Sequence, residues 1–154
     1  EDVRQMAFDM RPSALDDMGV VTALRRDIEI LSQTASFHAV FRAYDEDAIV
    51  LSADSEVALY RVVSAALTNT VQHARATHMS VIIQPRDGAV LATVEDDGRG
   101  FDTQAVLGGP VEARFGLLAM QERIANVGGE LTFQSSVGEG STVHITLPMQ
   151  RPNG

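Results

Sequence analysis

Apolar residues recur every three or four positions in four parts of the chain, and this periodicity predicts four helices. Arg11-Pro12 ends the first helix, because the residue before a proline is disfavoured in the α region. Gly128-Gly129 ends the last helix. The expected helices are a short one over residues 3–10, a second from Asp16 or Asp17 to about Ser32, a third from a cap at Asp54 or Ser55 to about Arg75, and a fourth over residues 116–127.

Shorter runs of alternating or β-branched residues predict strands. Residues 85–88, Pro-Arg-Asp-Gly, predict a hairpin turn between two of them. Residues 102–114 lose periodicity, which predicts a mobile loop of the length of a lid, and residues 102–115 are expected to close over a ligand. The expected strands cover residues 37–43, 80–84, 89–95, 131–135 and 142–147. This order predicts an α+β fold, a two-layer sandwich in which helices cover one face of a mixed or antiparallel sheet.

The composition narrows the function classes. A net charge of −9 argues against a nucleic-acid partner or an anionic membrane surface, since both need clustered Lys and Arg. ATP stays open, because backbone N–H groups and magnesium can attract its phosphates. The lack of cysteine excludes disulfides and thiolate metal sites, and no apolar run approaches the roughly 18 residues of a spanning helix. Because Glu1-Asp2-Val3-Arg4 resembles the middle of a sequence, we expect one domain of a longer protein.

A candidate nucleotide site follows the strand predicted over residues 89–95. Residues 94–101 read Val-Glu-Asp-Asp-Gly-Arg-Gly-Phe. Asp96 offers acceptor-only oxygens, which suit the exocyclic amine of a purine. Gly98 and Gly100 lack a Cβ, so backbone can pass close to a flat or charged ligand. Asp and Gly are also ordinary turn residues, so these eight residues by themselves fit a tight turn as well as a site.

Two polar residues lie near the end of the long third helix. Asn69 and His73 are four residues apart and therefore share a face. Asn69 is either a buried core amide or a ligand, and His73 is either a neighbour of phosphate or a structural donor. The remaining histidines have no ligand spacing and are expected to be structural or solvated: His38, His78 and His144.

Four motifs occur in a characteristic order. They are Leu-Tyr-Arg-Val-Val through Thr-Asn and His-Ala over residues 59–74, Asp-Asp-Gly-Arg-Gly-Phe at 96–101, Phe-Gly-Leu-Leu-Ala-Met-Gln-Glu-Arg at 115–123, and Gly-Glu-Gly-Ser-Thr at 138–142. With these separations, the chain resembles the catalytic, ATP-binding domain of sensor histidine kinases of the nitrate-sensor type, whose N box, two glycine boxes and closing glycine turn they match. The resemblance covers nearly the whole chain and implies the Bergerat-type fold shared with gyrase, Hsp90 and MutL ATPases.

The resemblance also divides the chain. Residues 8–12 and 15–19 look like the end of the family's dimerisation helix and its joint to the catalytic domain. We therefore expect residues 1–13 to be the end of that helix or a linker, residues 14–148 to be the ATP-binding domain, and residues 149–154 to be a disordered tail.

The resemblance implies ATP and Mg²⁺ as cofactors. Asp96 would accept a hydrogen bond from the adenine amine, and Asn69 would supply its amide oxygen to the magnesium ion. The amides of Leu117 and its neighbours, expected at a helix N-terminus, would receive phosphate oxygens. The implied nucleotide-binding residues are Asn69, His73, Asp96, Gly98, Gly100, Gly116, Leu117, Met120 and Thr142, with Asn69 also the metal ligand. Met120 is otherwise a core residue, and Thr142 otherwise bonds a neighbouring strand.

The sequence departs from the family at two positions of the N box. Ala65 stands where a glutamate usually precedes the asparagine by four residues, and Gln72 stands where Lys or Arg is common. The methyl group of Ala65 cannot take a proton or orient water, and Gln72 supplies no cation to face the phosphates. Both changes weaken the chemistry more than the adenine pocket, which keeps Asp96 and its glycines.

The partners implied by the resemblance lie outside the chain. None of the four histidines occurs in the family's phosphoacceptor motif. We therefore expect ATP to be presented to a histidine on the dimerisation domain of the same protein, a homodimer at full length, and the phosphate to pass to a response regulator. A cytoplasmic location is expected whether or not the parent is membrane-anchored, with no direct membrane contact by this domain.

Three other functions compete with the kinase hypothesis. Ala65 and Gln72 favour a degenerate nucleotide-binding signalling module with weak or no transfer. An ATPase of the gyrase or Hsp90 kind is disfavoured because Ala65 removes the residue that activates water. A purely structural protein has no need for glycines at 98, 100 and 116 together.

Overall fold

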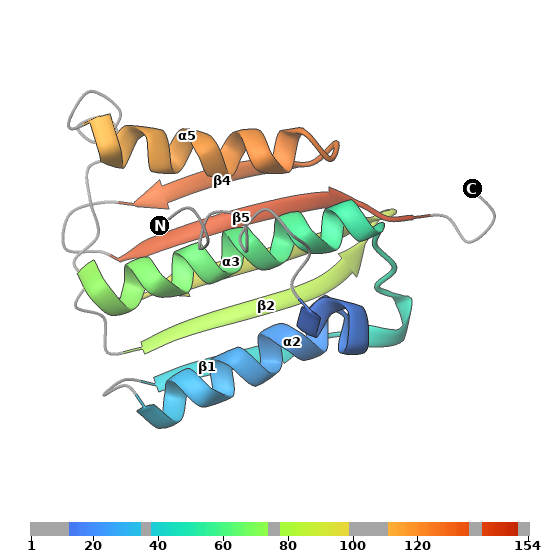
Figure 1. Ribbon diagram of the computed structural model, residues 1–154, viewed down its shortest axis with the longest axis horizontal. Coiled ribbons are helices and arrows are strands. Elements are labelled where there is room, and N and C mark those ends of the chain that lie inside the picture. Colours follow the sequence, from blue (N-terminus) through green and yellow to red (C-terminus); the bar gives the residue numbers. More distant parts are fainter. Residues whose placement is uncertain (1–12, 35–37, 74–77, 99–110, 136–139, 151–154) are drawn as a thin grey trace.

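The structure is a computed structural model that describes residues 13–34, 38–73, 78–98, 111–135 and 140–150 (Figure 1). In order, its elements are α2 (Ser13–Thr34), β1 (His38–Ala43), the 3₁₀ helix η1 (Glu46–Ala48), α3 (Ala53–His73), β2 (His78–Arg86), β3 (Ala89–Asp96), α5 (Val111–Ala125), β4 (Glu130–Ser135) and β5 (Ser141–Pro148). The helix predicted over residues 3–10 and residues 102–110 of the predicted lid lie outside the described residues.

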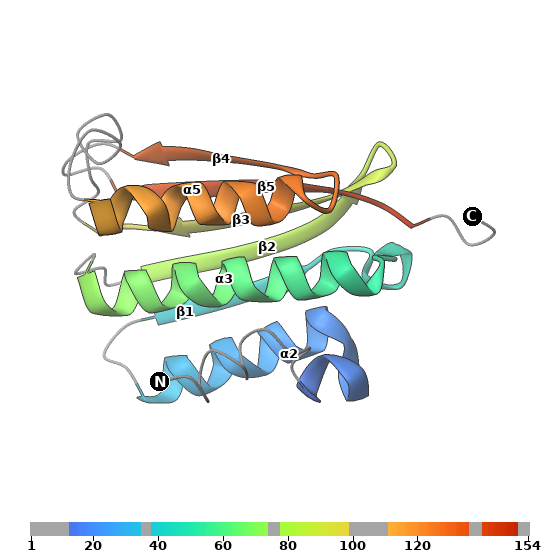
Figure 2. The same cartoon turned by 45° about the horizontal axis from the view of Figure 1, so that its top comes forward.

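The strands form one five-stranded sheet in the order β1-β2-β3-β5-β4. β1 pairs parallel with β2, and all other pairs are antiparallel, so the sheet is mixed. Figures 1 and 2 show α2, α3 and α5 side by side in one layer over the sheet, with α2 over β1 and α5 over β4. The predicted α+β two-layer sandwich is therefore confirmed.

Alternating burial in the strands determines which face meets the helices. Every second residue of β3 and of β5 is buried, including Val90, Ile145 and Leu147, which are fully enclosed. These side chains pack against the buried stripe of α3, whose Leu59 and Val63 are also fully enclosed. The period of two in the strands and the helical period in α3 thus meet in a single core.

Several predicted boundaries are wrong in detail. α2 begins at Ser13 rather than at Asp16 or Asp17. α3 begins at Ala53, because Ser52 caps it by accepting a hydrogen bond from the Ser55 N–H at 3.1 Å. Glu46–Ala48 is a short 3₁₀ helix that was not among the predicted elements.

The β2–β3 hairpin is tighter than predicted. β2 continues through Pro85 to Arg86, so only Asp87 and Gly88 form the turn, both with positive φ (54° and 80°). This is the two-residue hairpin that matches the twist of antiparallel strands. Pro85 is tolerated in the strand, although proline cannot donate a backbone hydrogen bond.

The C-terminal segment is ordered further than predicted. Met149 N–H donates to the Gly88 carbonyl at 3.2 Å, and Gln150 N–H donates to the Val50 carbonyl at 2.9 Å. Met149 also packs against the core. The tail expected from residue 149 is therefore wrong for these two residues, and residues 151–154 lie outside the described part.

A partly buried hydrogen bond joins α2 to α3. The Tyr60 hydroxyl donates to Asp27 Oδ2 at 2.6 Å. Burial, followed by this hydrogen bond and the charge of Asp27, raises the pKa of Tyr60 to about 12. The contact fixes the register of the two helices near the middle of their interface.

Tyr60→Phe is expected to lower stability by about 1–2 kcal/mol at neutral pH, because Asp27 loses its donor. A tyrosine ionises near pH 10 in an unfolded chain and near pH 12 here. The wild type therefore has the full contribution below about pH 10 and loses it as the pH rises toward about 12. Urea unfolding of both proteins at about pH 8 and about pH 11 should show their stabilities converging. A constant gap would contradict this linkage.

Candidate functional site

Asp96 is the last residue of β3, and its carboxylate is held by the turn that follows. Its Oδ1 accepts a hydrogen bond from the Gly98 N–H at 2.8 Å. The Asp96 side chain is half-buried and Gly98 is buried. When an aspartate side chain accepts a hydrogen bond from the backbone N–H two residues later, the chain forms a compact turn that also orients the carboxylate. The sequence therefore supplies both the turn and a fixed carboxylate, and the two interpretations of residues 94–101 are compatible.

Gly140, the residue just before β5, lies very close to the backbone of Asp96. It has a φ of +79°, and a Cβ there would lie 2.3 Å from the Asp96 carbonyl oxygen and 3.3 Å from the Asp97 Cα. A side chain cannot occupy that space. Gly140 was predicted as part of a glycine-rich turn but not as a site residue, and the missed signal is the spacing of Gly138 and Gly140.

Asp97, the residue after Asp96, joins the end of β3 to His78 at the start of β2 by hydrogen bonds. Its Oδ1 accepts from the His78 N–H at 2.8 Å, and its own N–H donates to the His78 carbonyl at 3.1 Å. Its Oδ2 lies 3.2 Å from His78 Nδ1, and the ring of His38 meets His78 edge-on at 5.6 Å between centroids. These contacts fit the structural role expected of His38 and His78, and they fix the end of β3 that carries Asp96.

Figures 1 and 2 show that α3 ends and α5 begins at the edge of the sheet where β3 ends. Asn69 and His73 belong to the last turns of α3, and Gly116 and Leu117 belong to α5. The backbone thus brings these predicted residues to the same end of the sheet as Asp96, which is the end at which β3 finishes. The side chains of residues 69–73 and 111–117 lie outside the described part, as does Gly100.

The prediction that Leu117 lies at a helix N-terminus is wrong. α5 begins at Val111, five residues before the expected start, so residues 111–115 are helical rather than part of a loop. Only the first four N–H groups of a helix lack an intrahelical partner. The amides of Gly116 and Leu117 therefore belong to the second turn of α5.

Met120 and Thr142 occupy less decisive positions. Met120 is half-buried and packs against the core. Thr142 is half-buried in β5, where its Cα partners are Glu95 on β3 and Gln134 on β4. His144, on the same face of β5 as Thr142, pairs with Thr93 and Thr132. This geometry fits both a structural and a ligand-binding role for Met120 and Thr142.

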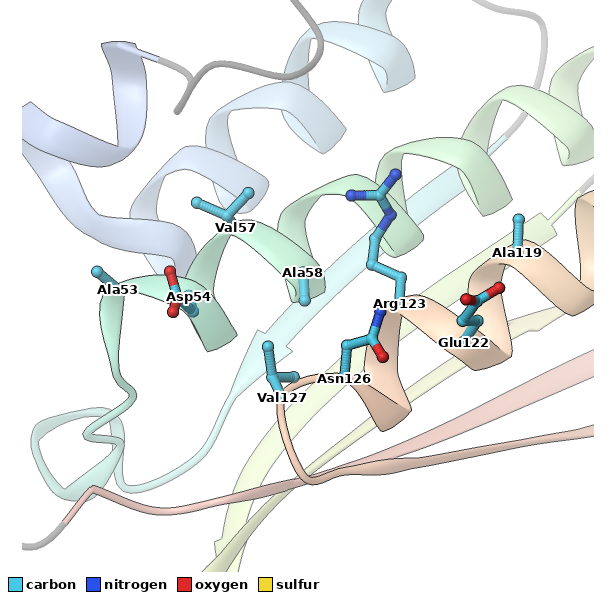
Figure 3. Close-up of a pocket in the computed structure, with 9 residues that line it drawn as sticks. All are labelled: Ala53, Asp54, Val57, Ala58, Ala119, Glu122, Arg123, Asn126 and Val127. Atoms are coloured by element: carbon cyan, nitrogen blue, oxygen red, sulfur yellow. The ribbon is translucent and has the colours of Figure 1, made fainter.

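A separate groove of about 550 Å³ lies between the start of α3 and the end of α5 (Figure 3). The residues that line it include the apolar Val57, Ala58 and Val127 and the charged Asp54 and Arg123. Asp96, Gly98, Met120 and Thr142 are the predicted nucleotide-binding residues whose side chains the structure describes, and none of them lines it. The groove is therefore distinct from the edge of the sheet at which Asp96 lies.

No group of three or more His, Asp or Glu side chains that could hold a metal ion occurs in the described ranges. Likewise, no helix among the described residues is long and apolar enough to cross a membrane.

A mixed sheet under one helical layer, with an aspartate and close-packed glycines where β3 ends, defines an ATP-binding domain of the Bergerat type. Residues 54–151 match the family described as histidine kinase-, DNA gyrase B- and HSP90-like ATPases. The chain belongs to this family. The match covers the segments that carry the four predicted motifs, so the resemblance stated from the sequence is confirmed.

Similar proteins with curated names include histidine kinases. The signal transduction histidine-protein kinase/phosphatase DegS of Brevibacillus brevis is 30% identical over 148 residues, which are 96% of this chain and 37% of that protein. An uncharacterized sensor-like histidine kinase of Chloroflexus aurantiacus is 35% identical over 153 residues, 97% of this chain and 26% of that protein. The chain thus spans well under half the length of each of these relatives.

Solved structures share the fold. The histidine kinase domain of the blue-light activated histidine kinase EL346 from Erythrobacter litoralis matches with a TM-score of 0.64 at 24% identity, over 84% of this chain and 59% of that one. The histidine kinase AdeS of Acinetobacter baumannii matches with a TM-score of 0.61 at 17% identity, over 86% of this chain and 64% of that one. At these identities the likeness concerns the fold alone.

Proposed function

We propose that this chain is the ATP-binding catalytic domain of a two-component sensor histidine kinase. It binds Mg-ATP and presents the γ-phosphate to a histidine on a dimerisation helix of the parent protein. The observation that carries the proposal is Asp96, whose carboxylate is fixed by the Gly98 N–H at 2.8 Å and whose backbone lies directly against Gly140. A carboxylate oriented in this way at the end of a buried strand suits the adenine amine.

The elements around Asp96 supply the rest of the proposed site. Asn69, on the last turns of α3, offers an amide oxygen to magnesium, and His73 follows one turn later. Met120 and Thr142 would border the nucleotide from α5 and β5. Gly98, Gly100, Gly116 and Leu117 complete the proposed set as points of close backbone approach, without a helix-terminus role for Leu117.

Bound magnesium would neutralise charge on the β- and γ-phosphates during transfer. The residues of the chain would bind the base and orient the phosphates. Phosphoryl transfer depends mainly on positioning and charge stabilisation, so a domain that holds the nucleotide without a catalytic base is chemically sufficient. The proposal therefore includes no catalytic residue on the chain itself.

The proposed partners follow from this division of labour. The dimerisation and phosphoacceptor domain of the same protein would present the histidine, with two copies of the parent forming a homodimer. A response regulator would receive the phosphate. ATP supply would place the domain in the cytoplasm, and the net charge of −9 supports neither nucleic-acid nor direct membrane binding.

Calorimetric titration of the domain with ATP, with and without magnesium, tests the proposal. The expected result is saturable binding of one nucleotide that magnesium strengthens at least tenfold. Binding of equal affinity with and without magnesium would indicate a module that binds adenine but lacks the metal chemistry of a kinase. Failure to bind under both conditions would overturn the assignment.

Ala65 supports one second candidate, a degenerate nucleotide-binding signalling module with weak or no transfer. Ala65 is half-buried on α3, one turn before Asn69. In the resembling kinases a glutamate usually occupies this position, and general acid or base catalysis contributes about 10²–10⁴-fold to a rate. An alanine methyl group supplies no part of that contribution.

Ala65→Glu in the parent protein distinguishes the two candidates. If the domain is an active kinase, the rate of histidine phosphorylation should change less than about threefold, because positioning supplies most of the rate. A gain of about a hundredfold or more would favour the degenerate module. Thr68→Glu is the matched control, since it adds the same charge at an exposed position of α3.

A further inference from the structure

α2 contains a break at Gly19. Its φ of 79° and ψ of 166° lie outside the helical region, in a part of conformational space that only glycine adopts readily. Figure 1 shows the first turns of α2, in dark blue, turned sharply against the rest of the helix. Residues 13–18 therefore have a different direction from residues 20–34.

Glu56 stabilises the bend from another helix. The break leaves the Val20 N–H at the start of a new helical segment, and this N–H donates to Glu56 Oε2 at 3.1 Å. A Cβ on Gly19 would lie 3.6 Å from the same oxygen, so the carboxylate lies directly against the bend. Glu56 is thus a cap for the second part of α2, and negative charge is favourable at such a helix start.

Glu56 also belongs to the first turn of α3. Its own N–H donates to the Ser52 carbonyl at 2.9 Å. From there α3 continues to His73, which places Asn69 about 20 Å along the same helix. One carboxylate therefore links the bend in α2 to the helix that carries the proposed magnesium ligand.

The segment after the bend is joined firmly to α3. Leu24 and Ile28 are fully buried in the shared core, and Asp27 accepts the hydrogen bond of Tyr60 at 2.6 Å. Residues 20–34 and α3 therefore behave as one packed unit. The direction of residues 13–18 relative to that unit depends on the conformation of Gly19 and on Glu56.

We propose that Glu56 is a positioning residue, which sets the angle between the segment entering the domain and the nucleotide-binding helix α3. This rests on the proposed function, in which the entering segment leads from the phosphoacceptor helix. A change of about 10° at the bend would move a group about 20 Å away by about 3 Å, and errors of about 1 Å can lower a rate about a hundredfold.

Spin-label distances in the domain measure the angle without any transfer reaction. The chain has no cysteine, so pairs of cysteines can be introduced at chosen positions. The pair 16 and 68 reports the entering segment against α3. The pair 29 and 68 lies wholly after the bend and is the matched control, and Glu29 and Thr68 are both exposed. Glu56→Ala should at least double the width of the 16–68 distance distribution and leave the 29–68 distribution unchanged.

The parent kinase provides the second readout. Glu56→Ala should lower the phosphorylation rate at saturating ATP at least tenfold while the KM for ATP changes less than twofold. Glu56→Gln, whose amide oxygen can still accept from Val20, should recover most of the rate. Glu46→Ala removes the exposed Arg25–Glu46 ion pair (2.7 Å), which also joins α2 to another element, and should leave both values unchanged.

The outcomes separate the two proposals. An unchanged 16–68 distribution, or equal broadening of both pairs, would overturn the positioning role of Glu56. If Glu56→Ala broadens the 16–68 distance distribution but leaves the phosphorylation rate unaltered, the role of Glu56 in the reaction is overturned. If the wild-type parent transfers no phosphate although the domain binds ATP, the kinase assignment fails, while the spin-label distances still decide whether Glu56 sets the angle.

Discussion

Asp96→Asn should abolish measurable ATP binding while the domain remains folded. One carboxylate oxygen already accepts the Gly98 N–H at 2.8 Å. An asparagine has only one side-chain oxygen, and keeping that turn would place its NH₂ group where the second oxygen was. The adenine amine would then face a donor instead of an acceptor. Two unsatisfied donors cost about 2–4 kcal/mol, which corresponds to about a 30- to 1,000-fold loss of affinity.

Calorimetric titration with ATP, together with urea unfolding, measures both halves of this prediction. Glu95→Gln is the matched control, because it makes the same change of charge on an exposed neighbour in β3. It should bind ATP as the wild type does. Tight binding by Asp96→Asn would place the adenine elsewhere and remove the main support for the proposed function.

Gly140→Ala should be among the most destabilising single substitutions at this edge of the sheet. The new Cβ would lie 2.3 Å from the Asp96 carbonyl oxygen, so backbone must shift. We expect a loss of about 3 kcal/mol or more in the free energy of unfolding, the range of severe steric substitutions. Because the displaced backbone carries Asp96, ATP affinity should fall as well, even at temperatures where the variant stays folded.

Gly88→Ala separates steric overlap from backbone strain. Gly88 has nearly the same φ, +80°, but a Cβ there would meet nothing within 4 Å. It should cost only about 1–2 kcal/mol, the price of a left-handed conformation for alanine, and should leave ATP binding unchanged. If Gly140→Ala costs no more than Gly88→Ala in urea unfolding, the close approach of Gly140 to Asp96 is not a constraint on the site.

The two substitutions act on the same carboxylate by different routes. Asp96→Asn changes its chemistry and leaves its position, whereas Gly140→Ala leaves its chemistry and changes its position. We expect both variants to lose ATP affinity and only Gly140→Ala to lose stability. This result would mean that the geometry of the binding site depends on β5 as much as on β3. That pattern is expected because Asp96 and Ser141 are Cα partners across the two strands.

The proposed role of Glu56 extends the same reasoning to the other end of α3. Glu56 in the first turn and Asn69, the proposed magnesium ligand, lie on the same helix, α3. In the proposed function, α3 would therefore connect the nucleotide contact to the direction of the entering segment. The groove beside Ala53 and Val57 lies at this same end of α3, and nothing in its lining assigns it a ligand.

Local patterns in the sequence determined the class of fold and the main candidate residue. The alternation of β3 and β5 and the helical stripe of α3 have periods that depend only on neighbouring residues, so these strands and this helix were predicted correctly. The turn after Asp96 was equally readable, because its hydrogen bond spans only two residues. The lack of periodicity before residue 116 misled the prediction of α5, whose helix begins at Val111.

Contacts between distant residues were decided only by the tertiary structure. The approach of Gly140 to Asp96, the link of Asp97 to His78 and the cap that Glu56 provides for Val20 each join residues far apart in the chain. The parallel pairing of β1 with β2 likewise requires α3 to cross between them. Periodicity and turn propensity report a residue's neighbours along the chain, whereas these contacts depend on how completed helices and strands pack around one core.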